Sequence, residues 1–228
     1  MVNFYAKRMT FSKEAIIHAM KETGVVPLFT HDDPDDAQQV IETSYRAGLK
    51  IFEFTNRRKN SFEVFKHLLT VAQKMPGMML GIGTVMDGPT AKKFIDVGAH
   101  FVISPVLQLD MAEVCKKHDR LWIPGCATLT EIVTARRNGA ELIKIFPGAV
   151  LGPKFISSIL PVVPDLQLMI TGGVEPTESN LSSWFSAGAT CVGMGSHLFT
   201  KDIISRRDWQ QLEKRIADVL QMVQTVRS

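Results

Sequence analysis

Two segments of the sequence place ionisable side chains inside apolar runs that alternate as β-strands do. In residues 51–57, Glu53 and Arg57 fall on one face, whereas Phe52 and Phe54 fall on the other. Charged groups are rarely kept in a buried strand without a partner or a task. The pair therefore marks either a site that offers a carboxylate and a guanidinium to a ligand or a salt-linked polar plug.

The second segment, residues 142–147, holds a lysine in apolar company. Lys144 shares a face with Leu142 and Phe146, and burial there would disfavour its ammonium form and lower its pKa. A lysine with a lowered pKa can attack a carbonyl carbon and form a Schiff base. A neighbouring Glu53 would raise the pKa of Lys144 instead. The alternative is a side chain that extends past the strand end into solvent, and the spacing favours neither interpretation.

Glycines gather at the ends of the last two apolar runs, as Gly172 and Gly173 in the first and as Gly195 before Ser196 in the second. Loops of this kind expose backbone N–H groups and let a phosphate approach closely. Each pair alone could be a tight turn. Their occurrence on two successive strands favours a phosphate site.

Eight apolar runs with strand character recur along the whole chain, and helix-length segments separate the consecutive runs. Eight parallel strands with short helical crossovers can close into a (β/α)8 TIM barrel, in which ligands bind at the carboxyl ends of the strands. The sequence therefore predicts an α/β fold with a single barrel domain over residues 1–228. An extra N-terminal helix at residues 11–21 is expected to plug the barrel bottom. The runs are 25–30, 50–55, 78–85, 101–105, 121–126, 142–147, 166–173 and 190–195.

Helix boundary signals fit this alternation. Asp33 and Pro34 are typical of a helix start, and Gly48 is typical of the end of the same helix. Thr128 and Glu131 have the spacing of a capping box at the start of another helix.

Composition excludes several classes of protein. The chain has 228 residues, of which 45% are hydrophobic and 21% charged, and 26 Lys and Arg against 23 Asp and Glu give a net charge of +3. That charge is too small to predict a nucleic-acid surface. Three scattered cysteines and six histidines lack disulfide or metal-site spacing, so we expect no metal site. No run approaches the roughly 18 apolar residues of a membrane span, and residues 1–14 lack the features of a signal peptide. We expect a cytoplasmic protein with no membrane partner.

Seven motifs follow one another along the chain: Glu53-Phe-Thr55-Asn-Arg57, Gly83-Thr84-Val85, Ile103-Ser104-Pro105, Pro124-Gly125, Lys144-Ile-Phe146-Pro147, Thr171-Gly172-Gly173 and Gly195-Ser196. In this order they resemble the motifs of the 2-keto-3-deoxy-6-phosphogluconate and 4-hydroxy-2-oxoglutarate aldolases. The resemblance implies a class I, metal-independent pyruvate aldolase, a lyase that needs no cofactor and is usually a homotrimer. Its substrate would be a 2-keto-3-deoxy-phospho-sugar acid or 4-hydroxy-2-oxoglutarate, and its products pyruvate and an aldehyde, glyceraldehyde 3-phosphate or glyoxylate.

The resemblance also implies a role for individual residues. Lys144 would form the Schiff base, and Glu53 would transfer protons. The substrate would be held by Arg57 and Thr84 at the pyruvyl carboxylate, by Pro105 and Phe146 along the pocket wall, and by Gly172, Gly173, Gly195 and Ser196 at the distal phosphate.

Three residues depart from the family pattern and leave the substrate open. Arg58 and Lys59 follow Arg57 where the family commonly has a small polar residue and then an acidic residue or proline. His197 follows Ser196 where a tryptophan or a small residue is common. If the glycine loops do not bind phosphate, Arg58 or Lys59 is the alternative anchor for the distal end of the substrate.

Two other functions remain compatible with the sequence. One is a phosphosugar isomerase or epimerase on the same barrel, which would need paired acid-base carboxylates or a metal rather than an inward lysine. The other is a module without catalytic activity that binds a phosphorylated sugar acid.

Overall fold

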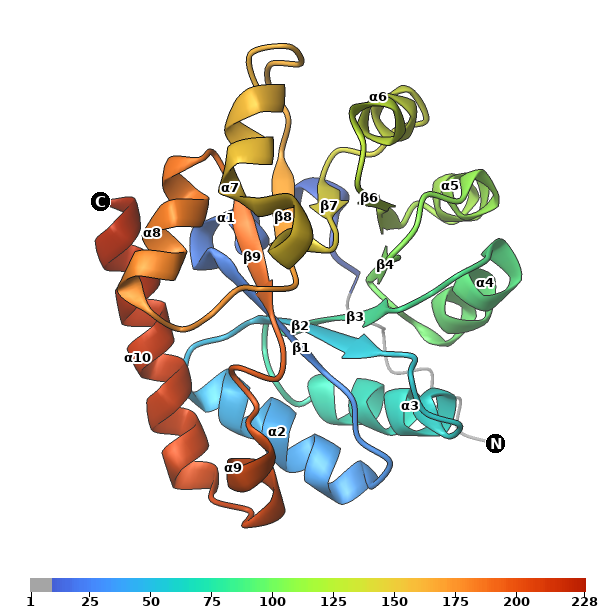
Figure 1. Ribbon diagram of the computed structural model, residues 1–228. Helices are drawn as coiled ribbons and strands as arrows, with labels where there is room; N and C mark the ends of the chain where they lie inside the picture. Colours follow the sequence, from blue (N-terminus) through green and yellow to red (C-terminus); the bar gives the residue numbers. More distant parts are fainter. Residues whose placement is uncertain (1–9) are drawn as a thin grey trace.

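The computed structural model describes residues 10–228, so most of the segment on which the expectation of no signal peptide rests lies outside the described residues. Figure 1 shows helices arranged around a ring of strands. The strands are β1 Val25–Phe29, β2 Ile51–Thr55, β3 Met79–Gly83, β4 Phe101–Ile103, β5 Leu121–Ile123, β6 Gly125–Cys126, β7 Ile143–Ile145, β8 Leu168–Thr171 and β9 Cys191–Met194. The helices are α1 Lys13–Thr23, α2 Pro34–Arg46, α3 Ser61–Ala72, α4 Gly88–Val97, α5 Leu109–Lys117, α6 Leu129–Arg137, α7 Gly148–Ile159, α8 Glu178–Ser186, α9 Lys201–Ser205 and α10 Trp209–Arg227.

The strands pair in parallel in the order β5-β4-β3-β2-β1-β9-β8-β7-β6. β5 and β6 are two pieces of the single run predicted at residues 121–126, which Pro124 interrupts because proline has no N–H to add to the ladder. The chain passes directly from β5 to β6, so this broken strand joins the two ends of the ring. The predicted (β/α)8 TIM barrel is confirmed, and the prediction of an unbroken strand at 121–126 is wrong.

Two apolar layers hold the barrel together. Alternate strand residues such as Ile51, Phe101 and Met169 fill the barrel interior, and Ile16 and Met20 of α1 pack against them. α1 therefore plugs the barrel bottom, as the sequence predicted. The other strand residues form a larger layer between the ring and the surrounding helices. Burial of each large apolar side chain stabilises the fold by about 1.5–3 kcal/mol.

Local signals set the helix boundaries. The Asp33 side chain accepts hydrogen bonds from the N–H groups of Asp35 at 2.8 Å and Asp36 at 3.2 Å at the start of α2. Thr128 and Glu131 form the predicted capping box at the start of α6. Loss of such a cap typically costs about 1 kcal/mol.

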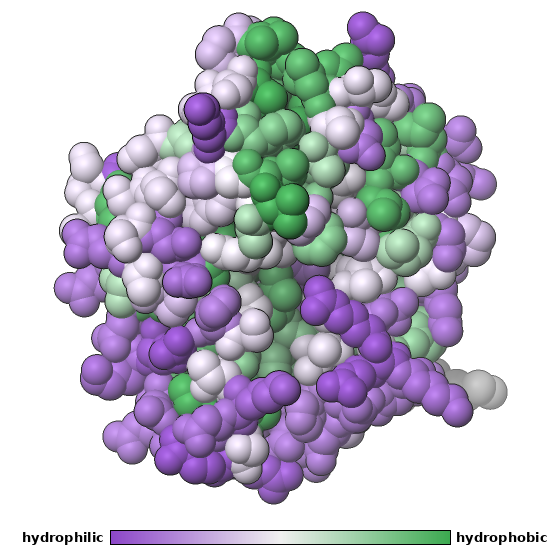
Figure 2. Space-filling view, viewed as in Figure 1, coloured by the Kyte–Doolittle hydropathy of each residue, from purple (hydrophilic) through white to green (hydrophobic). Residues whose placement is uncertain are grey.

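The parallel ring brings the carboxyl ends of all strands to one end of the barrel. Figure 2 shows hydrophilic residues gathered over α2 and α9 and hydrophobic residues over α7. Within residues 10–228, no helix has both the length and the apolar character needed to cross a membrane.

Candidate active site

Glu53 lies in the middle of β2 and points into the barrel, on the same face as Ile51. It is 1% exposed, and neither of its carboxylate oxygens has a hydrogen-bond partner among residues 10–228. Room for the carboxylate exists because Gly83, on the adjacent β3, has no side chain, and a Cβ at Gly83 would overlap it. Leaving a buried polar group without a partner costs roughly 1–3 kcal/mol, which favours a functional role for Glu53 over a structural one.

Lys144 lies in β7, and its side chain is also enclosed. The residue is 2% exposed, and its Nζ lies 5.2 Å from the centroid of the Phe146 ring. The alternative in which Lys144 extends into solvent is therefore wrong. Its neighbour in register on β6 is Gly125, which carries no side chain.

Burial shifts the pKa values of both Lys144 and Glu53. Desolvation lowers the pKa of Lys144 below its ordinary value of 10.5, against the opposing attraction of Glu53. Desolvation also raises the pKa of Glu53 above its ordinary value of 4.5, although the charges of Lys144 and Arg57 act in the other direction. Both shifts favour uncharged forms. The free amine, which is the form that attacks a carbonyl carbon, therefore becomes available at lower pH than in an exposed lysine.

Arg57 and Thr84 are joined by a hydrogen bond in which Arg57 Nε donates to Thr84 Oγ1 at 3.1 Å. Thr84 has a φ of 57°, which is unusual for a β-branched residue and typical of strained functional sites. Among residues 10–228, Arg57 forms no ion pair with Glu53, so the salt link of the polar-plug interpretation is absent. The guanidinium retains N–H donors that suit a carboxylate.

The two predicted phosphate-binding segments, Gly172-Gly173 and Gly195-Ser196, lie at the ends of β8 and β9. Gly172 and Gly173 have positive φ angles of 88° and 78°, and a Cβ at Gly173 would lie 2.7 Å from Ala149 Cα at the start of α7. Both positions therefore favour glycine for their backbone conformation, and Gly173 also has a packing requirement for it, in addition to any ligand. Ser196 is exposed beside Gly195 after β9.

Pro105 and Phe146, the two residues expected along the pocket wall, both lie close to β7, which carries Lys144. The backbone of Pro105, after β4, packs against Gly125, which is in register with Lys144. Phe146 follows β7 and is half-buried under the Lys144 amine. The structure thus brings both residues to the surroundings of Lys144.

Three threonines at strand ends were given no role from the sequence, although Thr55 and Thr171 belong to the quoted motifs. Thr30 follows β1, Thr55 ends β2 and Thr171 ends β8, and within the described part of the chain their buried hydroxyl oxygens have no hydrogen-bond partner. Thr55 could have been found, because it shares the inward face of Glu53. Such hydroxyl groups can pair with a polar ligand.

A cavity of about 860 Å³ opens at these strand ends, and Arg57 and Ser196 contribute to its lining. Its other side is formed by the loop after β1, by α9 and by the residues that follow α9. His31, Lys201 and Arg207 line it and had not been predicted, because their proximity depends on how these segments pack.

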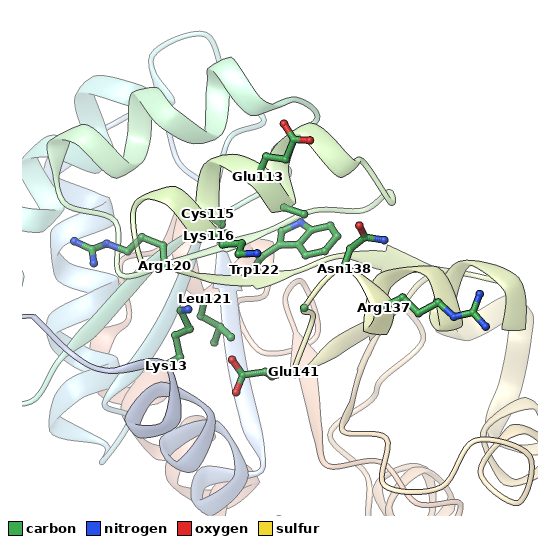
Figure 3. Close-up of a pocket in the computed structure, with 12 residues that line it drawn as sticks. Lys13, Glu113, Cys115, Lys116, Arg120, Leu121, Trp122, Arg137, Asn138 and Glu141 are labelled. Atoms are coloured by element: carbon green, nitrogen blue, oxygen red, sulfur yellow. The ribbon is translucent and has the colours of Figure 1, made fainter.

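A second cavity, of about 420 Å³, has none of the predicted site residues in its lining (Figure 3). α1, α5 and α6 contribute to this lining, and Figure 3 shows Trp122 of β5 between Cys115 and Asn138. Over the part of the chain that the structure describes, no group of three or more His, Cys, Asp or Glu residues is placed to hold a metal ion.

Known proteins are similar in sequence to most of this chain. A family model described as KDPG and KHG aldolase matches residues 16–215. A 2-dehydro-3-deoxy-phosphogluconate aldolase of Pseudomonas aeruginosa is 28% identical over 203 residues, which cover 88% of this chain and 90% of that protein. A probable 2-dehydro-3-deoxy-6-phosphogalactonate aldolase of Rhizobium meliloti is 30% identical over 168 residues, which cover 73% of this chain and 77% of that protein.

Solved structures share the fold. The KDPG aldolase from Legionella pneumophila, with pyruvate captured as a covalent carbinolamine intermediate, has a TM-score of 0.82 at 23% identity, covering 90% of this chain and 97% of that chain. The thiamine phosphate pyrophosphorylase from Pyrococcus furiosus has a TM-score of 0.67 at 12% identity, covering 91% and 99%. Because such barrels support different reactions, function must be argued from the site.

Proposed function

We propose, from the premise that this chain belongs to the KDPG and KHG aldolase family, that it is a class I aldolase that forms a Schiff base through Lys144 and releases pyruvate. The observation that carries the proposal is the enclosed amine of Lys144, whose pKa is lowered by burial, in the electrostatic range of the unpartnered carboxyl of Glu53. The covalent pyruvate intermediate in the Legionella pneumophila enzyme supports it.

In the proposed reaction, the unprotonated Nζ of Lys144 attacks the C2 ketone carbon of a 2-keto-4-hydroxy acid, and loss of water leaves a protonated imine. Glu53 accepts the C4 hydroxyl proton as the C3–C4 bond breaks. The electron pair of that bond moves into the imine, which forms an enamine and releases the aldehyde. Glu53 then returns a proton to C3, and water hydrolyses the imine to pyruvate and the free amine.

The remaining residues divide between the two ends of the substrate. We assign the pyruvyl carboxylate to Arg57 and Thr84, because their hydrogen bond fixes the guanidinium near Glu53. Pro105 and Phe146 form the wall beside the imine. The distal phosphate is assigned to the backbone of Gly172, Gly173, Gly195 and Ser196.

The substrates compatible with this arrangement are 2-keto-3-deoxy-6-phosphogluconate, its galactonate counterpart and 4-hydroxy-2-oxoglutarate. The names of the relatives in Pseudomonas aeruginosa and Rhizobium meliloti support the two phosphorylated acids. The homotrimer and the cytoplasmic location implied by the resemblance stay predictions, and sedimentation of the purified protein would test the first.

Exchange of the pyruvate methyl protons in deuterated water tests the proposal, because exchange requires the enamine and a base at that carbon. Proton NMR should show the methyl signal decay with the wild-type protein and persist with Lys144→Met. Lys154→Met, which removes an exposed lysine of α7, is the matched control and should exchange as the wild type does. Exchange that survives in Lys144→Met would contradict the assignment of the Schiff base.

A further inference from the structure

The cavity of about 860 Å³ extends beyond the residues that the proposed reaction uses. It begins at Arg57 and Ser196 and continues toward α9 and the turn between α9 and α10. Four cations, Arg57, Arg58, Lys201 and Arg207, line it against one carboxylate, that of Asp36. A concave surface with an excess of positive charge attracts anions.

Arg207 is held in place within this cavity. Its Nε lies 2.8 Å from Asp36 Oδ1 and its Nη2 lies 3.2 Å from Asp36 Oδ2, and Asp36 is only 9% exposed. The backbone of Arg207 has a φ of 54°, a conformation that non-glycine residues seldom adopt and that clusters at functional sites. A guanidinium has five N–H donors, so donors remain beyond those that Asp36 uses.

Arg58 also lines this cavity, and its side chain is held less firmly than that of Arg207. Its Nη1 lies 3.6 Å from Asp32 Oδ2, and both side chains are more than half exposed, so this ion pair contributes little. Its backbone N–H donates to Ser61 Oγ at 3.0 Å, and Asn60 donates to the carbonyl oxygen of Asp32. The bond from Asn60 ties the loop that carries Arg58 to the loop after β1, and the bond to Ser61 holds the Arg58 backbone at the start of α3.

Lys201 and His31 complete the lining. Within the described part of the chain, Lys201 forms no ion pair. The His31 ring stacks on Phe29 with an interplanar angle of 5°, and its Nδ1 accepts the N–H of Asp33 at 3.2 Å.

We propose that Arg58, Lys201 and Arg207 form a side-chain anion subsite that holds the distal phosphate of the substrate, beside the backbone of Gly195 and Ser196. This inference rests on the proposed function. A phosphomonoester at C6 offers three oxygens and close to two negative charges, which suits several cations at once. The second carboxylate of 4-hydroxy-2-oxoglutarate is C5 of a shorter chain and carries one negative charge, against close to two on a phosphomonoester. The subsite thus selects for phosphorylated six-carbon acids.

The test compares kcat/KM for cleavage of 2-keto-3-deoxy-6-phosphogluconate with kcat/KM for the same acid without its phosphate, within each variant. Because both substrates meet the same protein, a general loss of activity cancels in this ratio. Arg58→Gln and Lys201→Gln should each lower the ratio about tenfold or more, the usual effect of losing a charged hydrogen bond. Lys59→Gln and Arg206→Gln are matched controls, since these neighbouring cations do not line the cavity, and they should leave the ratio unchanged.

Inorganic phosphate provides a measurement that does not depend on catalysis. Its binding to the wild type, followed by calorimetry, should weaken in Arg58→Gln and Lys201→Gln but not in Lys59→Gln. An unchanged substrate ratio in Arg58→Gln and Lys201→Gln would overturn the subsite while pyruvate exchange still supports the aldolase. Phosphate binding without any exchange by the wild type would instead overturn the proposed function. Arg207→Lys adds a third variant, and its thermal unfolding shows whether loss of the Asp36 contact alters the fold.

Discussion

Replacement of Gly83 by alanine should displace Glu53, the proposed proton-transfer group, without altering its chemistry. Gly83 is buried at the end of β3, and the space beside its Cα is occupied by the carboxyl group of Glu53. A Cβ at this position would overlap the carboxylate and would lie 2.5 Å from Glu53 Cδ. The Glu53 side chain must therefore move.

The size of the effect follows from these distances. Ordinary contact with a Cβ begins at 3.4 Å, so Glu53 Cδ, at 2.5 Å, has to shift by at least about 0.9 Å, and the overlapping carboxylate oxygen has to shift further. A misplacement of about 1 Å at a reacting group can reduce the rate about 10²-fold. The inserted methyl group should also lower the free energy of unfolding by roughly 1–3 kcal/mol through overpacking.

Pyruvate release measured at saturating substrate checks the prediction, with urea unfolding to record stability. Gly81→Ala is the matched control, because it inserts the same methyl group one inward position earlier in β3, where it meets the ring of Phe101 instead of the carboxylate. It should lose stability by a similar amount and keep far more turnover. Wild-type turnover in Gly83→Ala, or equal losses in the two variants, would refute the reasoning about the position of Glu53.

Three further predictions concern the same site. Glu53→Gln should reduce turnover about 10²–10⁴-fold while the pyruvate adduct on Lys144 still forms by mass spectrometry, and wild-type turnover would show that another group moves the proton. The pKa of Glu53 is about 4.5 in the unfolded chain and is raised by burial in the folded protein, so above pH 4.5 the folded protein retains a proton that the unfolded chain has lost. The free energy of unfolding of the wild type, relative to that of Glu53→Gln, should thus fall as pH rises from 4.5 through the raised pKa. If urea titrations give the same difference between the two proteins at every pH, the burial argument is contradicted. Arg57→Gln should raise the KM for pyruvate in the exchange reaction about tenfold or more, and an unchanged KM would remove Arg57 from the carboxylate site.

The barrel fold and the inward positions of Glu53 and Lys144 could be predicted because both depend on local sequence patterns. Repeated apolar runs with intervening helices are sufficient for the fold, and strand alternation alone places Glu53 and Lys144 on inward faces. The interruption of the strand at Pro124 could also have been anticipated, because proline cannot donate to a ladder.

The remaining features depend on contacts between distant segments. No spacing in the sequence decides whether Lys144 is enclosed or extends to solvent, because that depends on the packing around the end of β7. The role of Gly83 depends on the register of β2 against β3. Arg207 lines the cavity of about 860 Å³ because of its left-handed backbone between α9 and α10 and its contact with Asp36. Asp36 lies 171 residues earlier in the chain.

Reduction with borohydride in the presence of pyruvate, followed by peptide mass spectrometry, tests the Schiff base most directly. The proposal predicts one reduced pyruvyl adduct per chain, on the peptide that contains Lys144, with loss of cleavage activity in proportion to its formation. The variant Lys144→Met should acquire no adduct. An unmodified Lys144 under saturating pyruvate, or an adduct on any other lysine of the active wild type, would contradict the account.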